Sequence, residues 1–325
     1  MQVSVVVPCH NSLTYLPETL DTILAQRLPT EVSGFEVVLV DDGGEDDLAT
    51  WVAALGDDRV RVVRQDNAGV SAARNLGIGS STGELIAFCD SDDLWLPDAV
   101  TDLVACFVRE PEIGLAYGWY DVVDAHGRPT GAKQRSDWEG QIWEQLVTDN
   151  VIGASGVMVR RSVVDDVGVF ATNRDRFPVD VEDWELWIRI AARWPVGSTH
   201  SVVYQYRRHD SNSSSDVESL DAAYEHLFDV VFAEVSPERA ALRPVASARA
   251  DVILAWQSLN DRREPARALE YLARAADRWA PVRRTTEYWR LWVAASALKV
   301  TGPRGYAAVR SLNAAVRRLR TRSGS

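Results

Sequence analysis

The stretch ELIAFCDSDDLWLP, residues 84–97, predicts a buried strand that ends in a cluster of carboxylates. Its apolar run, residues 85–89, has the length and composition of a strand covered on both faces, and Asp90, Asp92 and Asp93 follow it directly. Carboxylates packed this closely repel one another unless a cation or hydrogen-bond donors compensate them. Mg²⁺ and Mn²⁺ prefer such hard oxygen ligands. We therefore expect a functional site at the carboxyl end of this strand, although Asp93 is equally suited to cap the helix that follows.

Upstream of this stretch, the pattern alternates between strands and helices. Short β-branched or apolar runs predict strands over 4–7, 35–40 and 60–64, and apolar residues at helical spacing predict helices over 13–24, 48–55 and 70–78. Such alternation predicts βαβ units and a mostly parallel sheet covered by helices. Because ligands bind outside the carboxyl ends of such strands, the segments 8–11 and 41–46 are expected at the same edge as Asp90. For residues 45–47, exposed loop positions are an equally good interpretation.

Downstream, the pattern is mixed and then helical. It predicts helices over 97–109, 139–147 and 181–193, strands over 115–123 and 156–159, and a loop over 126–131. From residue 220 onward, the composition indicates helices only. We therefore predict one α/β domain over 1–218, with halves 1–95 and 96–218, and a basic α-helical region over 219–325.

Charge divides the chain in the same way. Residues 1–220 hold 17 Lys and Arg against 36 Asp and Glu, a net charge of −19, whereas residues 221–325 hold 18 against 11, a net charge of +7. The acidic front half argues against nucleic acid as a partner, because phosphate binding normally needs a cationic surface. No apolar run is long enough to span a membrane. Three scattered cysteines fit reduced thiols, and the first residues fit a strand rather than a signal peptide, so we expect a cytoplasmic protein.

Six segments in series carry a resemblance to a known family. SVVVPCHN, VDDGGED, DNAGVSAARNLGI, ELIAFCDSDDLWLP, GASGVMVRRSVVDDVGVF and VEDWELWIRIA, followed by YQYRRHDSNSSS, resemble the family 2 glycosyltransferases of the GT-A fold. The resemblance implies a mixed, mostly parallel Rossmann-like sheet flanked by helices, here with a helical extension. It also implies transfer of a sugar from a nucleotide-diphosphate donor to an acceptor hydroxyl with inversion, in the synthesis of surface polysaccharide, glycolipid or another glycoconjugate.

The resemblance also implies roles for residues at the donor side. A divalent cation, Mg²⁺ or Mn²⁺, would neutralise the leaving diphosphate and offset the acidic charge of this half. Asp92 is its expected ligand, with Asp90 as a metal or ribose contact and His209 as a further ligand. The remaining donor contacts that the resemblance implies are Pro8, His10, Asn11, Asp41, Arg74, Arg207 and Arg208. A salt bridge to the clustered carboxylates is an alternative for Arg74, and a solvated basic loop is one for 207–209.

At the acceptor side, the resemblance places the catalytic base at Asp183, with Glu182 in support. Trp184 and Ser155 are expected to contact the acceptor, because an aromatic face packs well against sugar C–H groups. The residues alone allow another interpretation for Asp183, a helix cap. A position at a helix N-terminus would lower the pKa of its carboxyl, which is the wrong direction for a base.

The tail also carries a prediction. Residues 262–325 hold 15 basic against 4 acidic residues, and an apolar stripe runs through Val309, Leu312, Val316 and Leu319. Such a helix either attaches reversibly to an anionic membrane, at its cytoplasmic face, or packs on the catalytic domain or a partner in a homodimer.

Two other classes of function compete with sugar transfer. A non-catalytic nucleotide-binding or signalling domain also gathers aspartates at strand ends, and a glycoside hydrolase uses two carboxylates. Dependence on a nucleotide-sugar donor separates the first hypothesis from both.

Overall fold

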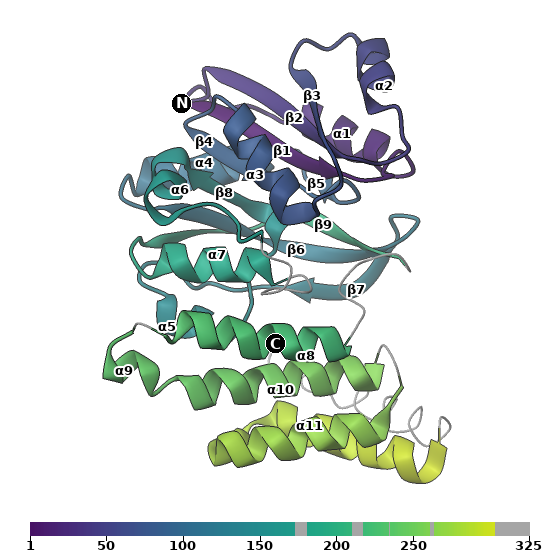
Figure 1. Cartoon of the computed structure of the whole chain (residues 1–325), viewed down its shortest axis with the longest axis vertical. Coiled ribbons are helices and arrows are strands. Elements are labelled where there is room, and N and C mark those ends of the chain that lie inside the picture. Colours follow the sequence, from purple (N-terminus) through teal and green to yellow (C-terminus); the bar gives the residue numbers. More distant parts are fainter. Residues whose placement is uncertain (173–180, 210–216, 234, 261–262, 303–325) are drawn as a thin grey trace, which may run out of the picture. The chain divides into compact units, whose positions relative to one another are not determined.

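The computed structural model describes residues 1–172, 181–209, 217–233, 235–260 and 263–302 (Figure 1). The chain divides into two compact units, Met1–Asn212 and Ser213–Ser325. The domain boundary that the sequence predicts after residue 218 lies close to this division. Among the described residues, no helix is both long and apolar enough to cross a membrane.

Unit 1 is built on one mixed sheet. Its strands are β1 (Gln2–Cys9), β2 (Gly34–Asp42), β3 (Val60–Gln65), β4 (Leu85–Phe88), β5 (Leu94–Trp95), β6 (Leu115–Asp124), β7 (Pro129–Gln134), β8 (Val157–Arg160) and β9 (Val196–Arg208). The order across the sheet is β3-β2-β1-β4-β8-β6-β9-β5, with β7 paired to β6. The first four strands run parallel, as predicted, whereas β8 is antiparallel to both β4 and β6. The carboxyl ends of β1, β2 and β4 therefore meet at one edge.

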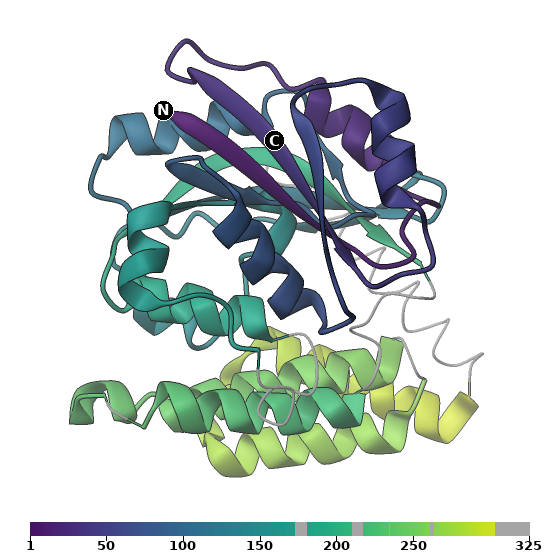
Figure 2. The same ribbon diagram turned by 45° about the horizontal axis from the view of Figure 1, so that its top comes forward.

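Helices cover both faces of this sheet. They are α1 (Leu16–Leu24), α2 (Leu48–Leu55), α3 (Val70–Ser80), α4 (Ala99–Arg109), α5 (Trp143–Leu146), α6 (Arg161–Val167) and α7 (Glu182–Ala191), with a short 3₁₀ helix at Ala154–Gly156. Figure 2 shows α1 and α4 on one side of the sheet and α3, α6 and α7 on the other. The result is a three-layer α/β unit with the strand ends left open for a ligand.

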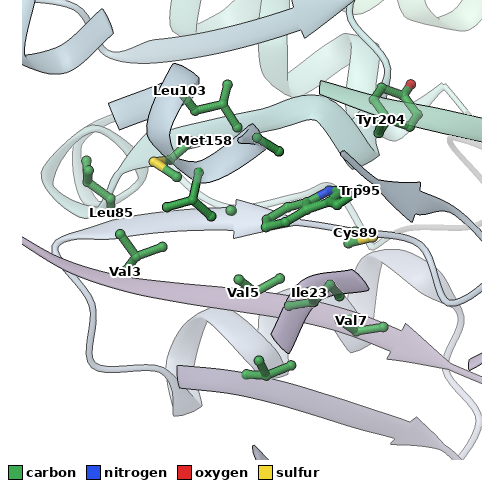
Figure 3. Packing of buried hydrophobic residues seen from close by; sticks show 14 of the residues in the cluster. Val3, Val5, Val7, Ile23, Leu85, Cys89, Trp95, Leu103, Met158 and Tyr204 are labelled. Atoms are coloured by element: carbon green, nitrogen blue, oxygen red, sulfur yellow. The ribbon is translucent and has the colours of Figure 1, made fainter. Parts of the chain in front are cut away.

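Alternation along the strands decides which residues face which layer. Val3, Val5 and Val7 of β1 pack with Ile23 of α1 and Leu103 of α4 in a core that is almost free of solvent (Figure 3). On the opposite face α3 lies close to the sheet, because its Gly77 has no side chain to hold the helix away. A Cβ atom at Gly77 would stand 2.3 Å from Val6 Cγ1. The sheet is therefore packed on both faces, and its strand ends extend from a buried core.

Five elements differ from the sequence prediction. β9 was not expected, since Gly197, Ser198 and the left-handed His200 (φ 53°) interrupt its apolar pattern, and its register against β6 shifts at two places. β7 lies partly where a loop is predicted, and it is held only through β6. β5 has two residues, too few for a pattern, and α6 was also missed. The helix expected over 139–147 is reduced to α5.

Unit 2 is helical, as predicted. It contains α8 (Val217–Val231), α9 (Pro237–Ala240), α10 (Arg243–Asn260), α11 (Pro265–Arg278), a 3₁₀ turn at Ala280–Arg284 and a helix over 286–302. Arg274 of α11 ties the first helices together, because it pairs with Asp221 of α8 and with the buried Asp251 of α10. The apolar stripe expected within 303–325 lies outside the described residues.

Candidate active site

A buried arginine, Arg74 of α3, joins the two halves of unit 1. Arg74 is only 4% exposed, and its guanidinium donates one hydrogen bond to Glu182 Oε1 and another to Asp90 Oδ1, each at 2.8 Å. Asp90 follows β4 and Glu182 opens α7, so one cation holds carboxylates from distant parts of the chain. This is the salt bridge that the sequence offered as one interpretation of Arg74, while its donor contact stays a prediction.

Asp183 lies next to this ion pair, with a half-buried side chain. Its Oδ1 accepts a hydrogen bond from the backbone N–H of Trp184 at 2.6 Å. Burial, and then repulsion from Glu182, raise the pKa of Asp183 to about 8 against the opposing effect of Arg74. The expected lowering of this pKa by the helix terminus is therefore wrong, because desolvation outweighs the helix dipole. A carboxyl group with this pKa is well suited to accept a proton.

Asp92 forms a second polar contact at the same edge. Its Oδ2 lies 2.8 Å from Nε2 of His209, the residue that follows β9. Burial and repulsion from Asp90 raise the pKa of Asp92, whereas the contact with His209 lowers it. The structure thus places Asp92 in contact with His209, two of the three residues that the sequence assigned to the metal, whereas the third, Asp90, is bound to Arg74.

Asp93 serves the fold of this loop instead of facing a ligand. It is 1% exposed and accepts hydrogen bonds from Ser155 Oγ at 2.5 Å and from the backbone N–H of Arg207 at 2.8 Å. Ser155 Oγ in turn accepts a hydrogen bond from the backbone N–H of Asp90. The helix cap proposed for Asp93 is wrong, since Asp98 occupies the N-cap position of α4.

The end of β9 packs against the start of α1. The side chain of Arg207 is 2% exposed, donates to the backbone oxygen of Asp92 at 2.7 Å and pairs with Glu18 of α1 at the same distance. Its guanidinium lies 5.0 Å from the centre of the Tyr15 ring, and Tyr15 also stacks on His209. Arg207 therefore supports the Asp92 loop from behind.

An open cavity of about 610 Å³ lies beside His209. Its lining comes from the β1–α1 loop, the β6–β7 turn and the end of β9: Tyr15, Asp124, Ala125, His126, Arg128, Arg208 and His209. Arg208 thus reaches an open surface, in contrast to Arg207. This cavity provides room for a ligand next to the Asp92 carboxylate.

The ends of β1 and β2 form the other side of the edge. His10 Nδ1 lies 3.0 Å from the carbonyl oxygen of Asp42, and Asn11, in the left-handed region (φ 51°), accepts from the backbone N–H of Glu45 at 2.7 Å. Asp41 is 3% exposed and is bound by Arg64 and by the backbone N–H of Gly44. The residues predicted for a nucleobase pocket therefore lie together, with His10 and Asn11 exposed.

Comparison with known proteins bears on what this edge does. The family model described as "Glycosyl transferase family 2" matches residues 4–168. The chain belongs to glycosyl transferase family 2. It is also 30% identical over 199 residues to an uncharacterized glycosyltransferase, alr2836, of Nostoc, with 58% of this chain and 56% of that protein covered. The predicted family, fold class and enzyme class, a glycosyltransferase, are confirmed.

Two solved structures share the fold. One is residues 1–349 of TarS from S. aureus in complex with UDP-GlcNAc, with a TM-score of 0.52, 19% identity, and 91% of this chain and 79% of that chain covered. The other is the mannosyltransferase PcManGT from Pyrobaculum calidifontis in complex with GDP-Man and Mn²⁺, with a TM-score of 0.56, 19% identity, and coverage of 96% and 86%. The chain spans only 33 to 56% of the length of the first curated relatives it matches, so the reaction of the whole protein is a proposal.

The family's use of a divalent cation can be tested against the side chains. In the described ranges, no group of three or more His, Cys, Asp or Glu residues stands ready to hold a metal ion. Mg²⁺ and Mn²⁺, however, typically take only one or two carboxylates and complete their shell with water and substrate phosphate. Asp92 Oδ2 and His209 Nε2 contact each other at 2.8 Å, so one carboxylate and one imidazole lie together at this edge. The side chains of this glycosyltransferase therefore fit the cation once substrate oxygens are added.

Three predicted contacts do not fit the structure. Trp184 has no exposed surface, because its ring fills the core and its Nε1 donates to the carbonyl oxygen of Leu146. Ser155 is 1% exposed and holds Asp90 and Asp93, so neither side chain can contact an acceptor in this conformation. Arg207 is sealed in behind Asp92 and cannot face a diphosphate. A fourth residue, Pro8, is also buried, within β1 beside Val40 of β2, so the contact predicted for its side chain stays a prediction.

Sequence reasoning missed two supporting residues, Tyr15 and Glu18. Tyr15 precedes α1 and Glu18 lies in its first turn. The fold brings Glu18 to Arg207, and it brings Tyr15 to both Arg207 and His209. The helical pattern of residues 13–24 gave no sign of this contact, because it reports only the face that packs on the sheet.

Proposed function

We propose that this glycosyltransferase moves a sugar from a nucleotide-diphosphate donor to an acceptor hydroxyl with inversion at the anomeric carbon, in a reaction that requires Mg²⁺ or Mn²⁺. The observation that carries the proposal is the placement of Asp183, with its pKa of about 8, beside the edge that bears Asp90 and Asp92. TarS in complex with UDP-GlcNAc and PcManGT in complex with GDP-Man and Mn²⁺ support a donor and cation of these classes.

The donor would lie along the strand ends. His10 and Asn11 are exposed beside Asp41 and offer a stacking ring and an amide to the base, while Asp90 is available to the ribose or the cation. The bound cation would supply countercharge to the leaving diphosphate through Asp92 and His209. Arg208, exposed at the cavity, is the arginine placed to assist.

Asp183 acts on the other substrate. Its carboxylate takes the proton of the acceptor hydroxyl as that oxygen attacks the anomeric carbon from the face opposite the diphosphate. Glu182 pairs with Arg74, and repulsion from Glu182 raises the proton affinity of Asp183. We propose an acceptor in surface polysaccharide, glycolipid or other glycoconjugate synthesis, and a cytoplasmic location for the reaction.

The test is incubation with a panel of nucleotide sugars in the presence of Mn²⁺ or Mg²⁺, followed by measurement of nucleoside diphosphate release. Asp183→Asn should bind the donor as the wild type does but lose turnover by a factor of about 10² or more. Asp165→Asn on the exposed surface of α6 is the matched control and should keep full activity. Normal turnover by Asp183→Asn would exclude Asp183 as the base. Activity that survives complete chelation would contradict the metal requirement. An Asp92→Ala variant whose activity still depended on the added cation would contradict the assignment of Asp92 as its ligand.

A further inference from the structure

The helix over 286–302 in unit 2 is apolar on two sides. One stripe, at helical spacing, is buried and consists of Tyr288, Leu291, Ala295 and Leu298, each no more than 7% exposed. A helix at the surface of a soluble protein usually needs only this one apolar stripe. A second apolar face therefore calls for a separate explanation.

The second face is exposed and aromatic. Trp289, Trp292, Val293 and Val300 are 49%, 42%, 46% and 82% exposed, and their spacing places them on one side of the helix. The two indole rings meet edge to face, with centroids 5.7 Å apart, and Trp289 Nε1 donates to the carbonyl oxygen of Arg283 at 2.6 Å. We call these four residues the tryptophan face. Contiguous exposed apolar surface of this kind marks an interaction site.

Basic residues surround the tryptophan face. Arg283 and Arg284 precede the helix, and Arg290 and Lys299 lie along it. In the part of the chain that the structure describes, none of these four side chains forms an ion pair. Glu287, the acidic residue of 280–302, is paired with Arg249. The sequence that follows, 303–325, adds six arginines and no acidic residue.

We propose that the tryptophan face binds the surface of an anionic lipid bilayer. Tryptophan is favoured at membrane interfaces because its ring is apolar while its N–H stays polar, and flanking Arg and Lys side chains are attracted to anionic headgroups. A second copy of the chain fits the face less well, since residues 221–325 carry a net charge of +7 and two copies would bring like charges together. The inference concerns a different surface from the sugar-transfer site and stands independently of it.

The test is co-sedimentation of the full chain with phosphatidylcholine vesicles, with and without about 30% phosphatidylglycerol. We expect binding to the anionic vesicles only. Trp289→Ser combined with Trp292→Ser should weaken that binding by about tenfold or more. Arg290→Gln and Lys299→Gln should each weaken it by about fivefold.

The matched control is Leu28→Ser combined with Leu55→Ser, which removes two exposed apolar side chains of unit 1, each 42% exposed. It should bind vesicles as the wild type does, and circular dichroism should show that every variant is folded. Unchanged binding by the double tryptophan variant would overturn the proposal and assign the binding to residues 303–325. The proposal would also be overturned if the wild-type chain did not bind the anionic vesicles. The same holds if light scattering showed a wild-type dimer that the double tryptophan variant no longer formed.

Discussion

Replacing Arg74 with methionine should destabilise unit 1 strongly, because the change removes a buried cation and keeps its two carboxylate partners. Methionine is flexible enough to occupy much of the same space. Glu182 would then be left with its side chain 8% exposed and Asp183 beside it, whereas the Asp90 side chain, 33% exposed, would regain water. The perturbation therefore takes the Arg74 countercharge away from one buried carboxylate.

The size of the effect follows from this burial. Removal of one partner of a buried ion pair costs about 3–5 kcal/mol, because the remaining charge is uncompensated. Since Asp90 is partly solvated, the lower end applies, and we expect a loss of about 3 kcal/mol in the free energy of unfolding near pH 8. Without the arginine, the pKa of Glu182 in the folded state rises above its unfolded value of about 4.3. The loss should therefore be small below pH 4 and should grow as the pH increases through the raised pKa.

Urea unfolding followed by near-UV circular dichroism, at pH 4 and at pH 8, measures this difference. The matched control is Arg27→Met, which removes an exposed pair with Asp98 whose side chains are 71% and 50% exposed. That change should cost less than about 1 kcal/mol. Adding Glu182→Gln to Arg74→Met should restore part of the stability. A loss at pH 8 no larger than that of Arg27→Met, or a loss independent of pH, would refute the reasoning.

Three further predictions concern the same layers of the structure. The pKa of Asp183 is about 8 in the folded state against an ordinary value of 3.8, so its ionisation lowers the free energy of unfolding as the pH rises between these values. Asp183→Asn should therefore be more stable than the wild type in urea unfolding at pH 8. Equal stability of the two proteins would contradict the raised pKa. The wild-type kcat/KM should rise with pH and level off above about 8, and a profile that falls over this range would exclude Asp183 as the base. Gly77→Ala should lower the free energy of unfolding by about 1–3 kcal/mol, whereas Gly79→Ala on the open side of α3 should lower it not at all, and equal effects would refute the close packing on Val6.

The predictable part of the fold was the part with a clear period. Residues 48–55 and 60–65 form a helix and a strand almost as the apolar pattern predicts, because each element buries a regular face in a regular place. β9 could not be predicted in this way, since it owes its order to pairing with β6 and β5 rather than to its own residues. Strand pairing between distant segments leaves little local signal, and the same holds for β7.

The candidate site shows a similar limit. The acidic ends of β2 and β4 could be located from the sequence, because any parallel sheet brings its carboxyl ends to one edge. The direction of a side chain could not. Trp184 follows the predicted base Asp183, and Ser155 lies within a segment that matches the family. The packing of the fold nevertheless buries both side chains. Tyr15 reached His209 only through the fold, which no spacing along the chain could indicate.

Electrostatic compensation explains which carboxylates of this edge are free for chemistry. Asp90 and Glu182 each receive a hydrogen bond from Arg74, so the two carboxylates share the charge of one guanidinium inside the protein. In the described chain, neither the Asp92 nor the Asp183 carboxylate receives a hydrogen bond from an arginine, and the pKa of each is raised. A carboxyl group in this condition gains most from binding a cation or a proton. Asp93 shares the raised pKa but is sealed from solvent, whereas Asp92 and Asp183 combine a raised pKa with partial exposure, which is the condition that their proposed roles require.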